Sequence, residues 1–199
     1  MKVIGVCNNY RVQDQVDNEF PAVYLMADST LLKDGKPFFI PDFSQDIRFH
    51  TSIVVKINRL GKNISSRFAH RYYDEITIGL TLKAEDIAKK YSELGLPSDI
   101  ATSFDGAAIL GEFINKDEIE NLDNIYYSLS INEDERLMGR INDLILKIDE
   151  LIEYISKYFT LKIGDILYTG YNSISLPIEM NQKISATLNG KVVLDFKTK

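Results

Sequence analysis

The stretch Phe49–Asn58 carries β-branched residues in quick succession, namely Ile53, Val54, Val55 and Ile57. Such side chains pack well on a pleated surface, so the stretch predicts a strand. Glu75–Leu82 predicts a second strand, because apolar residues occupy alternate positions along it. Two extended segments of this length predict that a β-sheet is the framework of the molecule.

Helices are expected at two places. Ala84–Leu94 carries an apolar face and is followed by Gly95, a typical helix stop. The stretch Asn142–Phe159 predicts the longest helix, because its apolar residues form one stripe with a helical period. Asn142 is expected to cap its start, with Ile141 packing onto Leu146.

Shorter segments complete the prediction. Further strands are expected at Lys2–Val6, Ala22–Met26 and Ile166–Tyr168. A closing hairpin of Ile184–Leu188 and Lys191–Phe196 is expected around Asn189-Gly190, and a short helix at Arg67–Tyr73. No internal repeat or linker interrupts the chain. Residues 1–199 are therefore expected to form a single α+β domain.

Bulk properties exclude several classes of function. The net charge of −6 argues against nucleic-acid binding, which needs clustered cations. No apolar run is long enough for a membrane span or a signal peptide, so we expect a cytoplasmic protein with no membrane partner. The lone Cys7 cannot form an internal disulfide and is expected to be a buried structural thiol.

General catalytic motifs are missing from the sequence. There is no phosphate-cradling glycine loop, no paired-cysteine zinc pattern, no His-Glu-x-x-His and no Gly-x-Ser-x-Gly. The two histidines, His50 and His70, are more often structural residues than ligands in such contexts. On its residues alone, the chain is a mixed-fold domain without a recognisable catalytic group.

Several blocks in series nevertheless resemble a known family. They are Val3–Tyr10, ending in Asn-Tyr; Ile53–Ile57 continuing to Asp74; Ile76–Gly79; Leu94–Pro97 with Phe104-Asp105-Gly106 and Gly111–Phe113; and Phe159–Gly170. In this order they are similar to compact bacterial members of the fumarylacetoacetate hydrolase family. The resemblance implies a mixed β-roll or barrel with flanking helices, often dimeric. It also implies the chemistry of acylpyruvate hydrolases, 2-hydroxyhepta-2,4-diene-1,7-dioate isomerases or oxaloacetate decarboxylases.

The family's metal ligands have no equivalent here. Active relatives hold Mg²⁺ or Mn²⁺ with a Glu-x-Glu pair and one Asp, because hard cations prefer charged oxygen. The pair matches His50 and Ser52, and the Asp of the pattern Asp-Phe-Thr-Ala-Arg-Asp matches Thr81. The Arg of that pattern matches Glu85, which reverses the charge. No metal is therefore predicted at these positions.

The family's catalytic positions have changed as well. The His of Asn-Tyr-x-x-His falls at Gln13, which cannot act as a base near neutral pH, and the Lys before Phe-Asp falls at Thr102. Four positions that match the family are expected to bind substrate: Asn9, Tyr10, Thr169 and Gly170. The sequence blocks that would build the fold resemble the family, whereas the positions of its metal ligands and catalytic residues all differ from it.

Three hypotheses follow from this pattern. The leading one is a catalytically inactive homologue with a binding or regulatory role, forming a homodimer or pairing with an active paralogue, with a small carboxylate as ligand and no cofactor. The alternative is an active hydrolase, isomerase or decarboxylase of small oxo-acids with a rearranged site. There, His50 serves as base, or holds Mg²⁺ or Mn²⁺ together with Glu85 or Asp86. The third is a structural dimer without a ligand.

Overall fold

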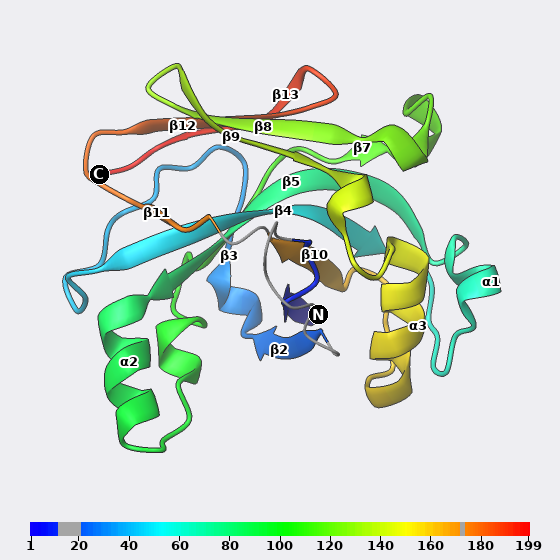
Figure 1. Cartoon of the computed structure of the whole chain (residues 1–199), viewed down its shortest axis with the longest axis horizontal. Helices are drawn as coiled ribbons and strands as arrows, with labels where there is room; N and C mark the ends of the chain where they lie inside the picture. The colour runs from blue at the N-terminus through cyan, green and yellow to red at the C-terminus, as the bar shows by residue number, and fades with distance from the viewer. Residues whose placement is uncertain (12–20, 172–173) are drawn as a thin grey trace.

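The computed structural model describes residues 1–11, 21–171 and 174–199. Within these residues it holds two β-sheets with short flanking helices (Figure 1). The larger sheet contains β1 (Val3–Cys7), β2 (Ala22–Met26), β3 (Leu31–Leu32), β4 (Ile47–Ile57), β5 (Tyr73–Ala84), β6 (Ala108–Leu110), β7 (Ile114–Asn115), β10 (Ile166–Tyr171) and β11 (Leu176–Pro177). The smaller sheet contains β8 (Tyr126–Ile131), β9 (Asp134–Arg140), β12 (Lys183–Leu188) and β13 (Lys191–Lys197).

The larger sheet is built around the antiparallel pair β4 and β5. It runs in the order β2-β1-β10-β4-β5-β6-β3, with β11 on β4 and β7 on β5. The pairs β1 with β10 and β3 with β6 are parallel, and the other pairs are antiparallel, so the sheet is mixed. It curves into a half-barrel, and the predicted α+β roll with flanking helices is confirmed.

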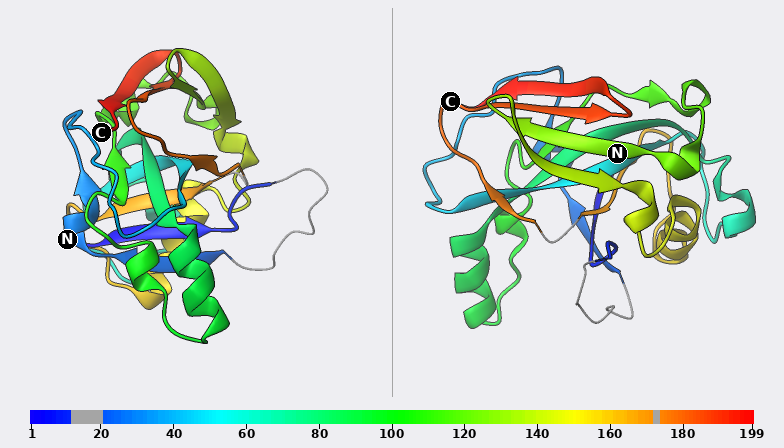
Figure 2. Two further views of the ribbon diagram at one scale, coloured as in Figure 1. Left: turned by 90° about the vertical axis from the view of Figure 1, so that its left-hand side faces the viewer. Right: turned by 45° about the horizontal axis from the view of Figure 1, so that its top comes forward.

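The smaller sheet lies across one face of the long strands, where β12 and β13 contact β5 (Figure 2). In the described part of the chain, the α-helices that flank the sheets are α1 (Ser66–Ala69), α2 (Glu85–Glu93) and α3 (Ile148–Tyr158). Short 3-10 turns connect elements at η1 (Asp28–Thr30), η2 (Asp99–Ala101), η3 (Lys116–Glu118), η4 (Leu122–Asn124) and η5 (Ile141–Asp143). Helices α2 and α3 stand at opposite ends of the long strands (Figure 1). Within the described residues, no helix is long and apolar enough to cross a bilayer.

Most predicted elements are confirmed within a few residues. The β-branched stretch forms β4, the alternating stretch forms β5, and the predicted N-terminal strand forms β1. The closing hairpin turns at Asn189 and Gly190, whose φ angles of 50° and 81° are those of a tight two-residue turn. The hairpin of β8 and β9 was not predicted, because its strands lack a run of branched residues.

The start of the longest helix was predicted wrongly. Helix α3 begins at Ile148, and residues 141–143 form the separate turn η5. Asn142 caps no α-helix, and no staple between Ile141 and Leu146 starts one. At the true helix start, the Lys147 amide instead donates to the carboxylate of Glu150, 2.9 Å away.

Asn9 explains why the segment before α3 is not helical. The Asn9 side chain is fully buried, and its amide nitrogen donates to the carbonyls of Leu146 (3.0 Å) and Thr169 (2.7 Å). Its Oδ1 accepts the Leu146 amide at 2.8 Å, and its own carbonyl accepts the Ile145 amide at 3.1 Å. These contacts occupy backbone groups that a helix would need, so tertiary hydrogen bonds override the helical pattern.

We predict that Asn9→Ala lowers the free energy of unfolding by about 2–4 kcal/mol, because it leaves buried backbone groups without partners. Chemical denaturation monitored by circular dichroism measures this change. Asn142→Ala is the matched control, since Asn142 is exposed and its loss should cost less than about 0.5 kcal/mol. If Asn142→Ala lowered the free energy of unfolding more than Asn9→Ala does, this account would be contradicted. Such a result would support Asn142 as the helix cap, as predicted from the sequence.

Candidate functional site

The register of β4 and β5 brings distant polar residues to one face of the larger sheet. His50 lies directly opposite Thr81, and Ser52 lies opposite Gly79 in the next pair on that face. Residues two apart on a strand share a face, and directly opposed side chains are close neighbours. The three positions expected from the sequence to correspond to metal ligands are therefore gathered in one place by the β4–β5 ladder.

A cavity of about 300 Å³ opens at this place. His50, Thr81 and Lys83 line it from β4 and β5, and Cys7, Tyr24 and Tyr171 line it from β1, β2 and β10. Further lining residues come from β2, β5 and the region of η2: Ala22, Val23, Leu25, Leu82, Ser98, Asp99 and Thr102. The cavity thus combines an imidazole, several hydroxyls and one ammonium group with apolar walls.

His50 is 9% exposed and lies deep in the cavity. Its ring stacks on Tyr171, with centroids 3.9 Å apart and planes inclined by 17°. Burial lowers the pKa of His50 to about 4, although the nearby Glu85 and a hydrogen bond to the Ile174 backbone act in the opposite direction. His50 is therefore neutral near pH 7.

The tautomer of His50 follows from its partners. Nδ1 is buried and has no hydrogen-bond partner among the described residues. The bond to the Ile174 backbone therefore belongs to Nε2, and it favours the protonated form, as a carbonyl acceptor does. With its proton on Nε2, neutral His50 keeps an unshared lone pair on Nδ1.

Two tyrosines shape the wall of the cavity. Tyr24 lies flat over β1, because Gly5 has no side chain: a Cβ there would be 2.2 Å from the Tyr24 ring. The Tyr171 hydroxyl donates to Cys7 Sγ at 3.0 Å. Burial raises the pKa of Tyr24, Tyr171 and Cys7, so all three remain protonated at neutral pH.

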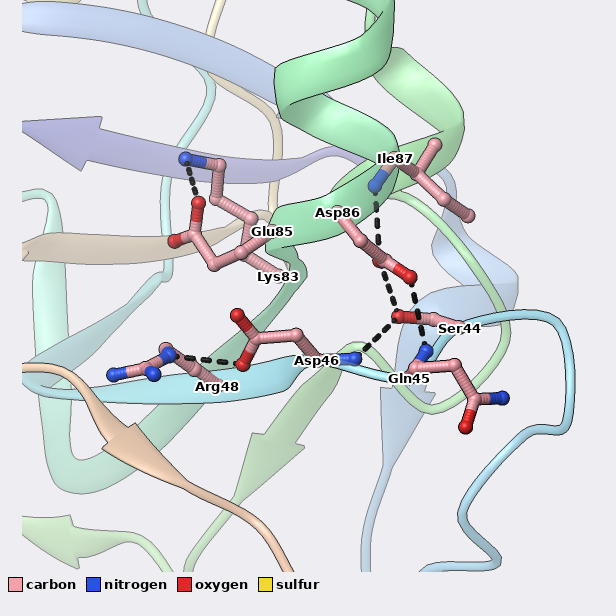
Figure 3. A network of polar contacts seen from close by, with 8 residues as sticks. All are labelled: Ser44, Gln45, Asp46, Arg48, Lys83, Glu85, Asp86 and Ile87. Carbon is pink, nitrogen blue, oxygen red and sulfur yellow. Dashed lines mark hydrogen bonds and ion pairs between the residues drawn. The ribbon is translucent and has the colours of Figure 1, made fainter.

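Lys83 forms an ion pair with Glu85, 2.9 Å away, where β5 ends and α2 begins. The next residue, Asp86, lies in the first turn of α2. Its carboxylate accepts hydrogen bonds from the Ser44 hydroxyl (2.6 Å) and the Gln45 amide (2.9 Å) (Figure 3). Asp86 also accepts the Ile87 amide in the first turn of α2. These bonds fasten the segment before β4 to the start of α2 and so support the end of the cavity.

The comparisons with known proteins decide the family. A family model described as the fumarylacetoacetate hydrolase C-terminal domain matches residues 2–175. This chain belongs to the fumarylacetoacetate hydrolase family. A protein of Pyrococcus abyssi (strain GE5 / Orsay) is 31% identical over 199 residues, covering 98% of this chain and 88% of the relative.

Named relatives in this family include two mitochondrial enzymes. The oxaloacetate tautomerase of Mus musculus is 27% identical, over 90% of this chain and 81% of its own length. The oxaloacetate decarboxylase of Dictyostelium discoideum is 28% identical, over 95% of this chain and 89% of its own length.

Solved structures of the family share the fold. A proposed fumarylacetoacetate hydrolase family protein of Yersinia pestis CO92 superposes with a TM-score of 0.90 at 28% identity, covering all of this chain and 92% of that one. The fumarylpyruvate hydrolase of Pseudomonas aeruginosa, solved with Mn²⁺ and pyruvate, superposes with a TM-score of 0.91 at 20% identity. The superposition covers 100% of this chain and 89% of that chain.

The donors of this member of the family do not fit Mg²⁺ or Mn²⁺. His50 offers one neutral nitrogen, and Ser52 and Thr81 offer hydroxyls, whereas these cations prefer carboxylate oxygens. The Ser52 hydroxyl is fully buried and finds no hydrogen-bond partner among the described residues. In the part of the chain that the structure describes, no three His, Cys, Asp or Glu side chains are placed to hold a metal ion.

The structure separates the residues expected to form the site. His50, Thr81 and Thr102 line the cavity, and Gln13 lies outside the described residues. Four expected substrate-binding residues are not among the cavity's lining residues: Asn9, Tyr10, Thr169 and Gly170.

The polar groups of these four residues have internal roles. Thr169 donates its hydroxyl to the Ile53 carbonyl, and the Tyr10 hydroxyl contacts the Arg140 backbone. Gly170 packs against Asn9, where a Cβ would come within 2.8 Å of the Asn9 side chain. Their role as substrate-binding residues stays a prediction.

Three cavity residues were not identified from sequence: Tyr24, Lys83 and Tyr171. Lys83 had a detectable signal, because it lies two residues after Thr81 on a predicted strand and so shares its face. Tyr24 and Tyr171 come from strands whose pairing the sequence does not specify. Cys7, expected to be a buried structural thiol, is half-buried and lines the cavity.

We predict that Asp86→Asn lowers the free energy of unfolding by about 1 kcal/mol or less at pH 7, because the charged acceptor at the start of α2 is lost from an exposed position. Hydrogen bonds from Ser44 and Gln45 lower the pKa of Asp86 in the folded protein. Its contribution is therefore present above the carboxyl's ordinary pKa and disappears as the pH falls through the lower, folded value. Thermal melting of both proteins between pH 7 and pH 3 should show curves that converge in acid; a constant difference would contradict this.

Proposed function

We propose that this protein is an active isomerase of small oxo-acids, which interconverts keto and enol forms in the cavity at His50. The observation that carries the proposal is the buried, neutral imidazole with a free Nδ1 lone pair. Keto–enol exchange needs only a base and an acid held near the substrate. The likeness to the mitochondrial oxaloacetate tautomerase of Mus musculus supports this reaction class.

The proposed step moves two protons and no other atoms. His50 Nδ1 takes a proton from the carbon between the keto group and a carboxylate. The C–H electron pair forms a carbon–carbon double bond, and the carbonyl oxygen takes a proton from the Tyr24 hydroxyl. The raised pKa of Tyr24 keeps that proton in place before the reaction. After the product leaves, His50 gives its extra proton to water and Tyr24 takes one back from water, so the net change is an isomerisation of the substrate alone.

Isomerisation suits these residues better than decarboxylation or C–C hydrolysis. In those reactions negative charge develops on the substrate. A bound Mg²⁺ or Mn²⁺ can neutralise that charge in relatives that hold such a cation. Here Ser52 and Thr81 do not fit such a cation. A proton donor close to the carbonyl oxygen can neutralise an enolate without a metal.

A binding role without turnover is the second candidate. It is supported by the joint replacement of the family's ligand positions by His50, Ser52 and Thr81. In that case the protein binds a small carboxylate as a homodimer or beside an active paralogue. Substrate binding without rate enhancement separates this role from the isomerase.

We predict that the wild-type protein accelerates the loss of the enol form of oxaloacetate, measured by ultraviolet absorbance, and that His50→Ala reduces kcat by about 100-fold or more. His70→Ala is the matched control, because His70 is exposed on the turn after α1 and should leave the rate within about twofold. A wild-type rate equal to the uncatalysed rate would contradict the proposed isomerase activity.

The pH profile tests His50 as the base. Because its pKa is lowered to about 4, the rate should be level from pH 8 down to about pH 5 and fall only as the pH approaches 4. The unfolded chain binds this proton already near pH 6.5, so folding stability also decreases between 6.5 and 4. Initial rates must therefore be paired with circular dichroism at each pH. A drop in rate centred near 6.5 with an intact fold would contradict a His50 base with this lowered pKa.

A further inference from the structure

An oxo-acid brings one or more carboxylates, and a cavity that binds it must supply compensating charge. Moving an unpaired carboxylate out of water is strongly unfavourable. The positions that match the family's metal ligands offer only neutral groups here. The charge therefore has to come from elsewhere on the cavity wall.

Lys83 is the cation that lines the cavity. It follows Thr81 by two residues on β5, so it projects from the same face of the sheet as the Thr81 and His50 pair. Its side chain is 37% exposed, whereas His50 is 9% exposed. Lys83 is therefore the more accessible of the two, and His50 is the more buried. A small acid can point a carboxylate at Lys83 while its reacting carbon faces His50.

Glu85 holds Lys83 in the absence of ligand. Their ion pair is partly exposed, and such pairs contribute little to stability, so the ammonium group can exchange this partner readily. An ammonium has three N–H donors, which leaves donors for a second carboxylate. The other charged lining residue, Asp99, is exposed on η2, where water screens its charge.

The pattern of substitution agrees with this arrangement. In the motif that resembles Asp-Phe-Thr-Ala-Arg-Asp, the family's Thr is Lys83 and its Arg is Glu85. The ligand-position carboxylate at Thr81 has been lost in the same motif.

We infer that Lys83, and not a divalent cation, binds the substrate carboxylate in this protein, with Glu85 as a competing internal anion. This inference rests on the proposed action on small oxo-acids. It assigns to Lys83 a recognition role and leaves the proton transfer to His50.

Malonate is a suitable probe, because it carries two carboxylates on a short chain and leaves binding separate from turnover. Calorimetric titration of the whole protein in EDTA should give saturable binding of malonate and none of malonamide, its uncharged analogue. Lys83→Met should weaken malonate binding by about tenfold or more, and Lys83→Arg should restore most of it. Glu85→Gln should tighten binding by about threefold or more, because it removes the competing carboxylate.

Two results would overturn the inference. The first is malonate binding that appears only after Mg²⁺ or Mn²⁺ is added back. The second is equal affinity in wild-type protein and Lys83→Met, with melting curves showing that the variant is folded. Failure of the proposed isomerase is seen separately, in the oxaloacetate assay and in His50→Ala. If malonate binds through Lys83 but oxaloacetate is not turned over, the inference about Lys83 holds. The proposed isomerase function would then be replaced by a carboxylate-binding role.

Discussion

The antiparallel pairing of β4 with β5 is the constraint on which both the fold and the cavity depend. Their register runs from Ile47 opposite Ala84 to Ile57 opposite Tyr73, with one irregularity near the end. A slip of one residue would turn His50 and Thr81 to the opposite face and bring apolar side chains into the cavity. The buried apolar residues on the alternate positions prevent this slip, so the hydrophobic core fixes the chemistry of the site.

The electrostatics of the cavity differ from those of a metal centre. A site made of carboxylates around a divalent cation places strong charge at the deepest point. Here the cavity holds a buried, neutral histidine, and the charged groups, Lys83 and Glu85, are partly exposed. Such a site favours proton transfer in its interior and recognition of charge nearer its opening. The two roles can be separated by mutation because they belong to different residues.

Family membership constrains the fold more closely than the activity. The scaffold of the fumarylacetoacetate hydrolase family is retained along nearly the whole chain. Complete loss of activity, the leading hypothesis from the substituted positions, is less well supported than an active, rearranged site, given the named relatives. The predicted substitution of metal ligands would remove one mechanism, but it leaves open those that need only an acid, a base and a bound carboxylate.

The sequence by itself determined the α+β class and the approximate extent of β1, β2, β4 and β5, because branched residues and period-two patterns act locally. The family followed from the resemblance of several sequence blocks in series. The resemblance also predicts that His50, Ser52 and Thr81 occupy the family's metal-ligand positions, and this stays a prediction. Only the tertiary structure decided that α3 begins at Ile148, since Asn9 binds backbone groups of residues 145 and 146 from far along the chain. Likewise, only the pairing of β1, β2 and β10 beside β4 brought tyrosines to the cavity, because hydrogen bonds between distant strands leave no local pattern in the sequence.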